Sequence, residues 1–194
     1  MRSVIRFLGL ELDSTQLLQL ERFGEWLGTE GARAGGIGPA EFDRIERRHL
    51  ADSLLFAVGI PGDAEEVWDL GTGVGLPGIP LAITFPEIRF VLIDRSQRRV
   101  DLLRRFVRIG DLKNCQVLQA EIADLSGEVG VIVTRASLSP EKLQAIGEKL
   151  LSEGGVMIVG GSWIDPPAEP GWEIKEIPRD VLDQAIWLLM MRHA

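Results

Sequence analysis

Residues 69–80 read Asp-Leu-Gly-Thr-Gly-Val-Gly-Leu-Pro-Gly-Ile-Pro, a glycine-rich turn between an apolar strand and an expected helix. Gly71, Gly73 and Gly75 have no Cβ and can adopt positive φ, so the backbone can pass against a bound ligand where any side chain would collide. A glycine-rich turn that leads from a strand into a helix indicates a site for a nucleotide-type cofactor.

The spacing of the glycines is compatible with two classes of cofactor. Asp69 and the glycines that follow it give the order D-x-G-x-G-x-G, which is typical of S-adenosylmethionine (SAM) methyltransferases. Gly73, Gly75 and Gly78 also satisfy G-x-G-x-x-G, the dinucleotide pattern. Asp94, at the end of the next apolar run, suits the adenosine ribose of either cofactor because its carboxylate can accept hydrogen bonds from both hydroxyls.

Two prolines shift the balance toward SAM. Pro77 and Pro80 occupy the turn and the first helical positions, where a dinucleotide site would need free N–H groups directed at a pyrophosphate. SAM has no phosphate to bind, so missing N–H groups do not count against it. We therefore expect SAM as the cofactor, and an NAD-dependent oxidoreductase stays as an alternative.

Length and composition predict one domain over 1–194, because 194 residues of which 45% are hydrophobic can bury one core. No apolar run approaches the roughly 18 residues that span a bilayer. The charged, interrupted start of the chain is unlike a secretory signal. The single cysteine, Cys115, excludes an intramolecular disulfide and makes a cysteine-based zinc site improbable. We expect a cytoplasmic protein with no membrane partner and no metal.

The formal net charge of −8 argues against a protein that binds nucleic acid by bulk electrostatics. Local groups of arginines could still bind phosphates. Six arginines fall between Arg95 and Arg108, and a second group lies at Arg44, Arg47 and Arg48. For any one of these residues, the simplest interpretation is a solvated position on a helix.

Helical spacing predicts an N-terminal helical extension over about 10–58. Asp13 can cap a helix that runs to about Leu27. Pro39 suits the first turn of a second helix. The glycines between the two helices predict a loop over 28–38.

Strands and helices alternate in the remainder of the chain, which we predict as the core over about 66–194. The expected strands are 67–70, 90–93, 115–118, 131–134 and 156–159, and the expected helices begin near 78, 97 and 140. This order predicts an α/β, Rossmann-like fold, in which a mainly parallel sheet has helices on both faces. The runs 173–177 and 185–191 predict a terminal pair of strands.

Ligands of such a sheet bind at the carboxyl ends of its strands. Four candidate residues fall at or just after these ends, namely Gly71, Asp94, Ile122 and Arg135. Arg135 follows the apolar run 131–133 after a single threonine, so its charge needs either solvent or a fixed anion.

Four segments together resemble the small-subunit (16S) ribosomal RNA methyltransferase G family, also called glucose-inhibited division protein B. They are Arg48-His49-Leu50-Ala51-Asp52-Ser53-Leu54, residues 69–83, Leu92-Ile93-Asp94 with Arg98-Arg99, and Thr134-Arg135-Ala136. The likeness covers most of the chain from about residue 10. It implies a Rossmann-like SAM-dependent methyltransferase fold that methylates guanine N7 in 16S ribosomal RNA, with that RNA or the small ribosomal subunit as its partner.

The resemblance also implies site residues. The cofactor-binding set is Asp69, Gly71, Thr72, Gly73, Gly75, Leu76, Asp94, Arg95, Ile122, Ala123 and Arg135. Within it, Asp94 would hold the ribose, and Ile122 and Ala123 would lie along the adenine. Arg135 would face the reaction centre as the catalytic residue. The residues that would contact the substrate or shape the pocket are His49, Asp52 and Ser53.

The chain departs from the family pattern in three segments that could touch RNA. The glycine-rich residues 28–38 replace an Asn-Leu-Thr segment, Gly160-Gly161 stands where the family often shows a lysine before glycine, and apolar residues 185–187 replace an arginine or histidine. Arg95 also stands where serine is more usual. Two further alternatives follow, a divergent member with a shifted target and a methyltransferase fold without activity that binds RNA or protein.

Overall fold

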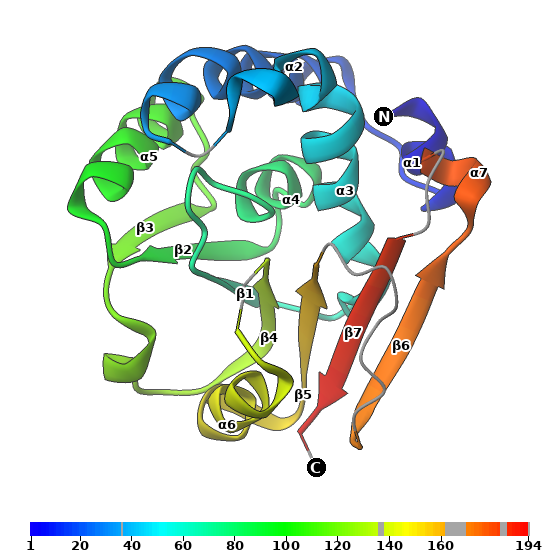
Figure 1. Cartoon of the computed structure of the whole chain (residues 1–194), viewed down its shortest axis with the longest axis vertical. Coiled ribbons are helices and arrows are strands. Elements are labelled where there is room, and N and C mark those ends of the chain that lie inside the picture. Colours follow the sequence, from blue (N-terminus) through cyan, green and yellow to red (C-terminus); the bar gives the residue numbers. More distant parts are fainter. Residues whose placement is uncertain (36, 136–137, 162–169, 183–185, 194) are drawn as a thin grey trace.

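The computed structural model describes residues 1–35, 37–135, 138–161, 170–182 and 186–193. Within these ranges, seven strands form one sheet in the order β3-β2-β1-β4-β5-β7-β6 (Figure 1). The strands are β1 Glu66–Leu70, β2 Arg89–Asp94, β3 Cys115–Gln119, β4 Val129–Thr134, β5 Leu151–Gly160, β6 Trp172–Ile177 and β7 Ile186–Arg192. β1 to β5 are parallel, whereas β7 pairs antiparallel with β5 and β6 pairs antiparallel with β7.

The helical segments confirm the predicted alternation of helices and strands. In the described part of the chain they are α1 Arg2–Phe7, α2 Ser14–Trp26, η1 Leu27–Gly31, η2 Pro39–Arg44, η3 Ile45–Leu50, α3 Ala51–Leu55, η4 Phe56–Gly59, α4 Gly78–Thr84, α5 Gln97–Ile109, η5 Ile122–Asp124, α6 Pro140–Leu150 and α7 Arg179–Leu182. The α/β fold with a mainly parallel sheet and an N-terminal helical extension is therefore confirmed. The division into domains stays a prediction.

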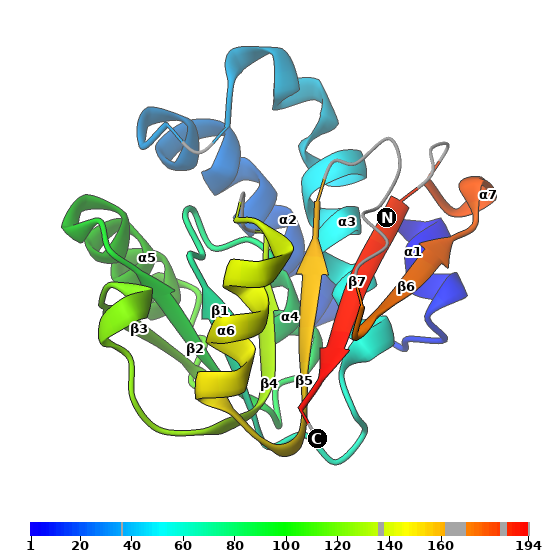
Figure 2. The ribbon, with the colours of Figure 1, turned by 60° about the horizontal axis from the view of Figure 1, so that its bottom comes forward.

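Alternate residues of each strand enter two separate hydrophobic cores, as the period of a β-strand requires. Phe90 and Leu92 belong to the first core, whereas Val91 and Ile93 belong to the second. Buried residues of α2, α3, α4 and α5 complete the first core, and α6 closes the second. Figure 2 shows α6 on one face of the sheet, with α2, α3 and α4 behind the other. Helices thus cover both faces, as predicted.

The N-terminus of α2 is fixed by a capping box. Asp13 Oδ1 accepts a hydrogen bond from Gln16 N at 2.8 Å, and Asp13 N donates to Gln16 Oε1 at 2.9 Å. Gln16 Nε2 also donates to the carbonyl oxygens of Ile83 and Thr84. The same side chain therefore starts α2 and ties the helical extension to the end of α4.

The predicted loop over 28–38 is wrong in its first part. Leu27–Gly31 is a π-helical continuation of α2, and residues 32–33 are also helical. Ile45–Leu50 is π-helical as well. A Cβ at Gly28 would lie 3.3 Å from Ile45 Cδ1, so the absent side chain lets these two segments pack closely. This contact between segments distant in sequence supports helix where local propensity predicts loop.

The terminal strands confirm the predicted pair, with one difference in arrangement. The last strand, β7, inserts between β5 and β6, so the edge of the sheet is β6 rather than the chain's final strand. The expected strand over 185–191 is found from Ile186, and Ala185 lies outside the described residues. Ser3 Oγ donates to Val181 O at 2.7 Å, which links α1 to the neighbourhood of this pair.

Candidate cofactor and active site

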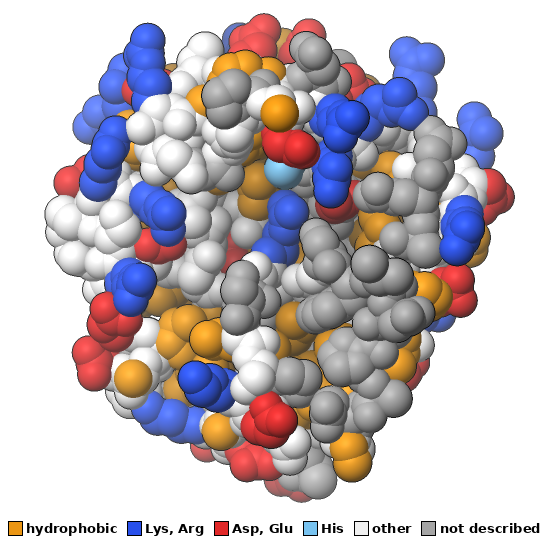
Figure 3. Space-filling view, viewed as in Figure 1, with side chains coloured by type: hydrophobic (Ala, Val, Ile, Leu, Met, Phe, Trp, Pro, Cys, Tyr) orange, Lys and Arg blue, Asp and Glu red, His pale blue; other side chains and the backbone are white. Residues whose placement is uncertain are grey.

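The carboxyl ends of β1, β2 and β4 are held together by hydrogen bonds. Thr134 Oγ1 donates to Leu70 O at 2.8 Å, which joins the end of β4 to the end of β1. The N–H groups of Gly71 and Thr72 both donate to Ile93 O, at 2.9 and 3.0 Å, which joins the turn after β1 to β2. Figure 3 shows a recess on this face, between the helical extension and the sheet, with charged side chains in it.

The glycines of the turn after β1 divide into two kinds. Gly71 and Gly73 have φ of +70° and +62°, and a Cβ on either would meet no side chain within 4 Å. A Cβ on Gly75 would lie 2.7 Å from Ile79 Cγ1, and one on Gly78 would collide with Leu92 and Asp69. Gly71 and Gly73 therefore leave open space above the backbone, whereas Gly75 and Gly78 serve internal packing.

The first turn of α4 has no N–H group available for a phosphate. Gly78 N donates to Asp69 Oδ2 at 2.8 Å, and Ile79 N donates to Gly75 O at 2.9 Å. Pro80 has no N–H group. A dinucleotide site needs donors at this position. The geometry therefore argues against NAD. The reason is the lack of free N–H groups at the start of the helix, which the prolines already indicate in the sequence.

Asp69 is fully buried and holds the turn from within. Its Oδ2 atom accepts hydrogen bonds from Thr72 Oγ1 at 2.6 Å and from Gly78 N, while Oδ1 has no hydrogen-bond partner. Burial raises the pKa of this carboxyl to about 7, and the hydrogen bonds from Thr72 and Gly78 oppose the rise. For Asp69 and Thr72, the geometry indicates support of the turn rather than exposure toward a ligand.

Asp94 closes β2 directly beside this turn and is 4% exposed. Its Oδ2 accepts a hydrogen bond from Gly73 N at 2.9 Å, and its Oδ1 accepts one from Ser96 N at 2.8 Å. Each carboxylate oxygen can accept a second hydrogen bond, so the group keeps the capacity to hold ribose hydroxyls. The link to Gly73 also fixes the carboxylate against the open part of the turn.

A second polar cluster joins the end of β4 to the helical extension. Arg135 interacts electrostatically with the carboxyl groups of Asp52 and Asp69, which oppose the lowering of its pKa by burial. Burial raises the pKa of Asp52 to about 6, and the guanidinium groups of Arg135 and Arg48 oppose that rise. Asp52 Oδ1 is buried without a hydrogen-bond partner. The structure thus brings together residues that are 83 positions apart in the sequence.

His49 belongs to this cluster, and its surroundings favour the neutral form of its imidazole. Its pKa is lowered first by burial and then by the charge of Arg135, while Glu41 opposes the change. Its Nε2 lies 3.6 Å from Glu41 Oε2, which is too long for a hydrogen bond, and neither ring nitrogen has a hydrogen-bond partner. Arg48 Nε lies 3.7 Å from the same oxygen.

The other predicted site residues occupy varied positions. Ser53 is fully buried and its hydroxyl donates to His49 O at 2.7 Å within the helical extension. Leu76 is buried in the first core. Ile122 is half-buried and Ala123 exposed, in the short helix after β3. Arg95 is exposed beside Asp94. The ligand contacts of these residues stay predictions.

Two residues near these clusters were missed by the sequence analysis as site residues. Arg99 Nη1 lies 3.6 Å from Asp94 Oδ2, and Glu41 approaches both His49 and Arg48. Arg99 could have been found, because a side chain in the first turn of a helix points back toward the preceding strand end. Glu41 precedes its partners by seven and eight residues across irregular helix, a separation without a sequence signal.

The structure accounts for one departure from the family pattern. A Cβ on Gly160 would collide with the ring of Phe56, so this position at the end of β5 is reserved for packing against η4. The ring of Phe56 therefore fills the space beside the position where the family often has a lysine. Trp187, in the segment that lacks the family's arginine or histidine, has its indole nitrogen buried without a hydrogen-bond partner.

Among the described residues, no three His, Cys, Asp or Glu side chains are grouped so that they could hold a metal ion. Nor is any described helix both long and apolar enough to cross a membrane.

The sheet order and the turn at its carboxyl edge define a Rossmann-like methyltransferase fold. A solved structure with this fold, precorrin-6y C5,15-methyltransferase from Geobacter metallireducens, superposes with a TM-score of 0.56 and 13% sequence identity, covering 74% of this chain and 88% of that one. At this identity the likeness concerns the fold alone. The family model described as rRNA small subunit methyltransferase G matches residues 16–163, and the chain belongs to this family.

Curated relatives are similar over most of this chain but are longer. The ribosomal RNA small subunit methyltransferase G of Frankia alni is 39% identical over 154 residues, which cover 76% of this chain and 58% of the relative. That of Acidothermus cellulolyticus is 37% identical over 137 residues, covering 71% of this chain and 61% of the relative. The chain thus spans about three-fifths of the length of these relatives.

Proposed function

We propose that this protein is a SAM-dependent methyltransferase that methylates guanine N7 in 16S ribosomal RNA. The observation that carries the proposal is the pairing of two open glycines, Gly71 and Gly73, with a carboxylate at the end of β2, while the first turn of α4 offers no free N–H group to a phosphate. Membership of the family supports the choice of substrate. A ribosomal target would place the protein in the cytoplasm.

The residues present fit a phosphate-free nucleoside. Gly71 and Gly73 leave room for it, and Asp94 would accept hydrogen bonds from its ribose. Ile122 and Ala123, just after β3, would border the base. When bound, SAM would supply a methyl group on a sulfonium centre, which is an electrophile.

The reaction requires no general base from the protein, because guanine N7 carries a free lone pair at neutral pH. Holding two partners in the reactive geometry can supply about 7–11 kcal/mol of the barrier reduction. We assign this positioning to Arg135, whose planar guanidinium would donate two parallel hydrogen bonds to an adjacent phosphate or one to guanine O6, and either contact leaves the N7 lone pair free. Asp52 and Asp69 would keep the guanidinium in place.

The test incubates the protein and labelled SAM with small ribosomal subunits or deproteinised 16S RNA from a strain that lacks the modification. We expect one labelled 7-methylguanine, mapped by primer extension after cleavage. Binding of SAM without transfer to either RNA would instead support the inactive module.

Two variants separate cofactor from substrate. Asp94→Ala should weaken SAM binding in calorimetry, whereas Asp101→Ala, an exposed aspartate on α5, serves as the matched control. Arg135→Ala, compared at saturating SAM, should lower the single-turnover rate by about 100-fold, the cost of removing one positioned donor. An undiminished rate would remove Arg135 from the mechanism, and an unchanged SAM affinity of Asp94→Ala would discard the ribose assignment.

A further inference from the structure

A separate hollow of about 770 Å³ lies between the helical extension and α5. Its walls carry Arg33 and Glu30 on one side and Arg98, Asp101 and Arg105 on the other, and Leu102 also lines it. None of these residues belongs to the cofactor set or to the cluster around Arg135. The hollow is therefore distinct from the candidate cofactor and active site.

The arginines of the hollow are only partly engaged within the protein. Arg98 Nη2 donates to Arg33 O at 2.7 Å, which closes one end. Arg33 pairs with Glu30 at 3.0 Å, but three-quarters of its side chain is exposed, so solvent weakens the pair. Arg105 is exposed and forms no hydrogen bond or ion pair with any residue that the structure describes. Two guanidinium groups are thus available to an anion.

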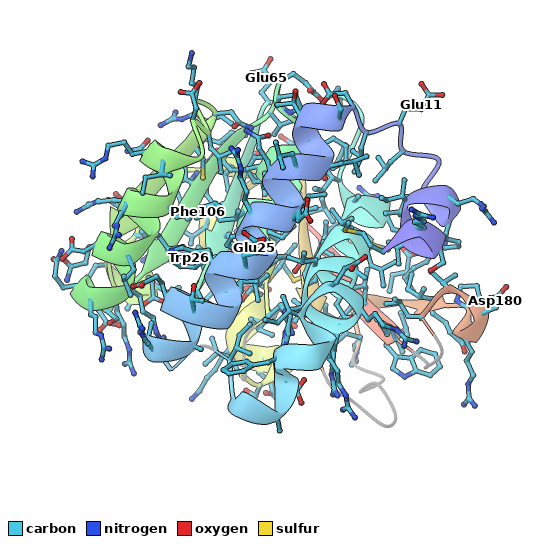
Figure 4. All side chains as sticks on the ribbon, turned by 90° about the horizontal axis from the view of Figure 1, so that it is seen from above. Glu11, Glu25, Trp26, Glu65, Phe106 and Asp180 are labelled. Carbon is cyan, nitrogen blue, oxygen red and sulfur yellow. The ribbon has the colours of Figure 1, made fainter. Side chains whose placement is uncertain are left out.

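The charge of α5 is unusual in a chain with a net charge of −8. Residues 97–109 contain five arginines and a single acidic residue, Asp101, which lies 3.8 Å from Arg104. Figure 3 shows basic side chains gathered over α5, and Figure 4 shows nitrogen-tipped side chains projecting outward from it. Like charges held on one helix repel one another, so the arrangement favours a polyanion that neutralises several of them.

The position of the hollow relates it to the proposed active site. α5 begins three residues after Asp94, and Arg99, the neighbour of Arg98, lies 3.6 Å from the Asp94 carboxylate. The opposite edge of the sheet is acidic, where Asp63, Glu65, Glu66, Glu128 and Glu153 line another hollow at the amino ends of the strands. A polyanion would therefore be directed to the carboxyl edge and repelled from the other.

We propose that the hollow between residues 30–33 and α5 binds the sugar-phosphate backbone of the RNA strand next to the target nucleotide. Arg33 and Arg105 would contact phosphates, and the half-buried Leu102 offers an apolar surface to a ribose or base. This inference rests on the proposed function, because it takes RNA as the substrate. It adds which surface positions that RNA.

The test is the double variant Arg33→Gln/Arg105→Gln, with Arg108→Gln as the matched control. Arg108 is an exposed arginine of the same helix that does not line the hollow. Binding of a 16S RNA transcript is measured by fluorescence anisotropy over a series of KCl concentrations. The double variant should bind about tenfold more weakly, and its slope of log affinity against log salt should fall by roughly 0.7 for each lost contact to a single strand. Arg108→Gln should match the wild type.

Melting temperature and SAM affinity, both expected to be unchanged, show that the double variant is folded. Unchanged RNA affinity and salt slope would overturn the proposal, and so would an equal loss in Arg108→Gln, which would indicate a diffuse field around α5. The proposed function can fail independently of this proposal. If the wild-type protein transfers no methyl group but the double variant still binds RNA more weakly than the wild type, the RNA-binding role of the hollow stands and the methyltransferase activity is refuted.

Discussion

Asp69 supports the glycine turn after β1 through hydrogen bonds to its buried carboxyl group. The family resemblance places it among the cofactor-binding residues, whereas its carboxyl is fully buried and accepts hydrogen bonds from Thr72 and Gly78. A buried carboxylate is costly unless it is compensated, and burial raises its pKa to about 7. The turn that leaves Gly71 open is therefore supported by a carboxyl group that gains or loses its proton near neutral pH.

We expect this group to make the protein less stable as the pH rises from about 4 to 7. The pKa of Asp69 is about 7 in the folded state against 3.8 in the unfolded state, so in this range the folded protein binds more protons. Stability from this residue is fully present below pH 3.8 and is lost as the pH rises through 7, by about 1.4 kcal/mol per pH unit. Asp69→Asn should remove this dependence.

The measurement is urea denaturation of wild type and Asp69→Asn at several pH values, with the exposed Asp101→Asn as control. As the pH rises from about 4 to 7, the unfolding free energy of the wild type should fall relative to that of Asp69→Asn. Asp52, whose pKa is also raised, is present in both proteins and cancels. A difference that is constant with pH would contradict the assignment.

At the scale of elements, the sequence predicts what local patterns determine. The helix over 97–109 begins where the sequence predicts, and the parallel strands are found where apolar runs end in polar or glycine residues. Neither π-helical segment was predicted: Leu27–Gly31 and Ile45–Leu50 lie against each other, where a Cβ at Gly28 would be 3.3 Å from Ile45 Cδ1, and this tertiary contact has no local sequence signal. The insertion of β7 between β5 and β6 likewise depends on pairing that no local pattern encodes.

The same limit applies to the candidate site. Gly71, Asp94 and Arg135 could be placed at strand ends from the sequence, because parallel strands present their carboxyl ends at one edge. The electrostatic interaction of Asp52 with Arg135 could not be predicted, since it depends on how the helical extension lies over the sheet.

The docking of α2 against α5 is an element-scale contact with a consequence for the turn. Phe23 lies 5.8 Å from Trp26 and 5.0 Å from Phe106 between ring centroids, and Figure 4 shows Trp26 and Phe106 between the two helices. A Cβ at Gly75 would lie 3.4 Å from Phe23 Cζ. The aromatic cluster therefore also packs against the glycine turn.

Phe23→Ala should destabilise the protein by about 3–5 kcal/mol, because it leaves a cavity in the first core. It should also weaken SAM binding, since Gly75 loses the ring against which it packs. Leu18→Ala on the same helix changes a side chain that is 44% exposed and should stay within about 0.5 kcal/mol of wild type. Denaturation and calorimetry measure the two effects, and SAM affinity equal to wild type in folded Phe23→Ala would show that the turn is independent of α2.

In the whole molecule, the helical extension shares a hydrophobic core with the sheet that carries the candidate site. Phe23 and Leu54 of the extension share the first core with Val133 of β4. The extension also supplies His49 and Asp52 to the cluster around Arg135. Folding of the extension and assembly of the site should therefore be energetically coupled, and the coupling passes through groups that titrate.

A double-mutant cycle on Asp52→Asn and Arg135→Met measures that coupling, with stability read from urea denaturation. At pH 8 Asp52 is ionised, and we expect a favourable coupling of about 0.5–3 kcal/mol, the range for residues that share one ionic cluster. Removing either partner leaves the other as an uncompensated, largely buried charge. At pH 5, below the pKa of about 6 for Asp52, the carboxyl is protonated and the coupling should largely disappear. Additive single variants at pH 8, or a coupling unchanged at pH 5, would show that Asp52 does not hold the guanidinium.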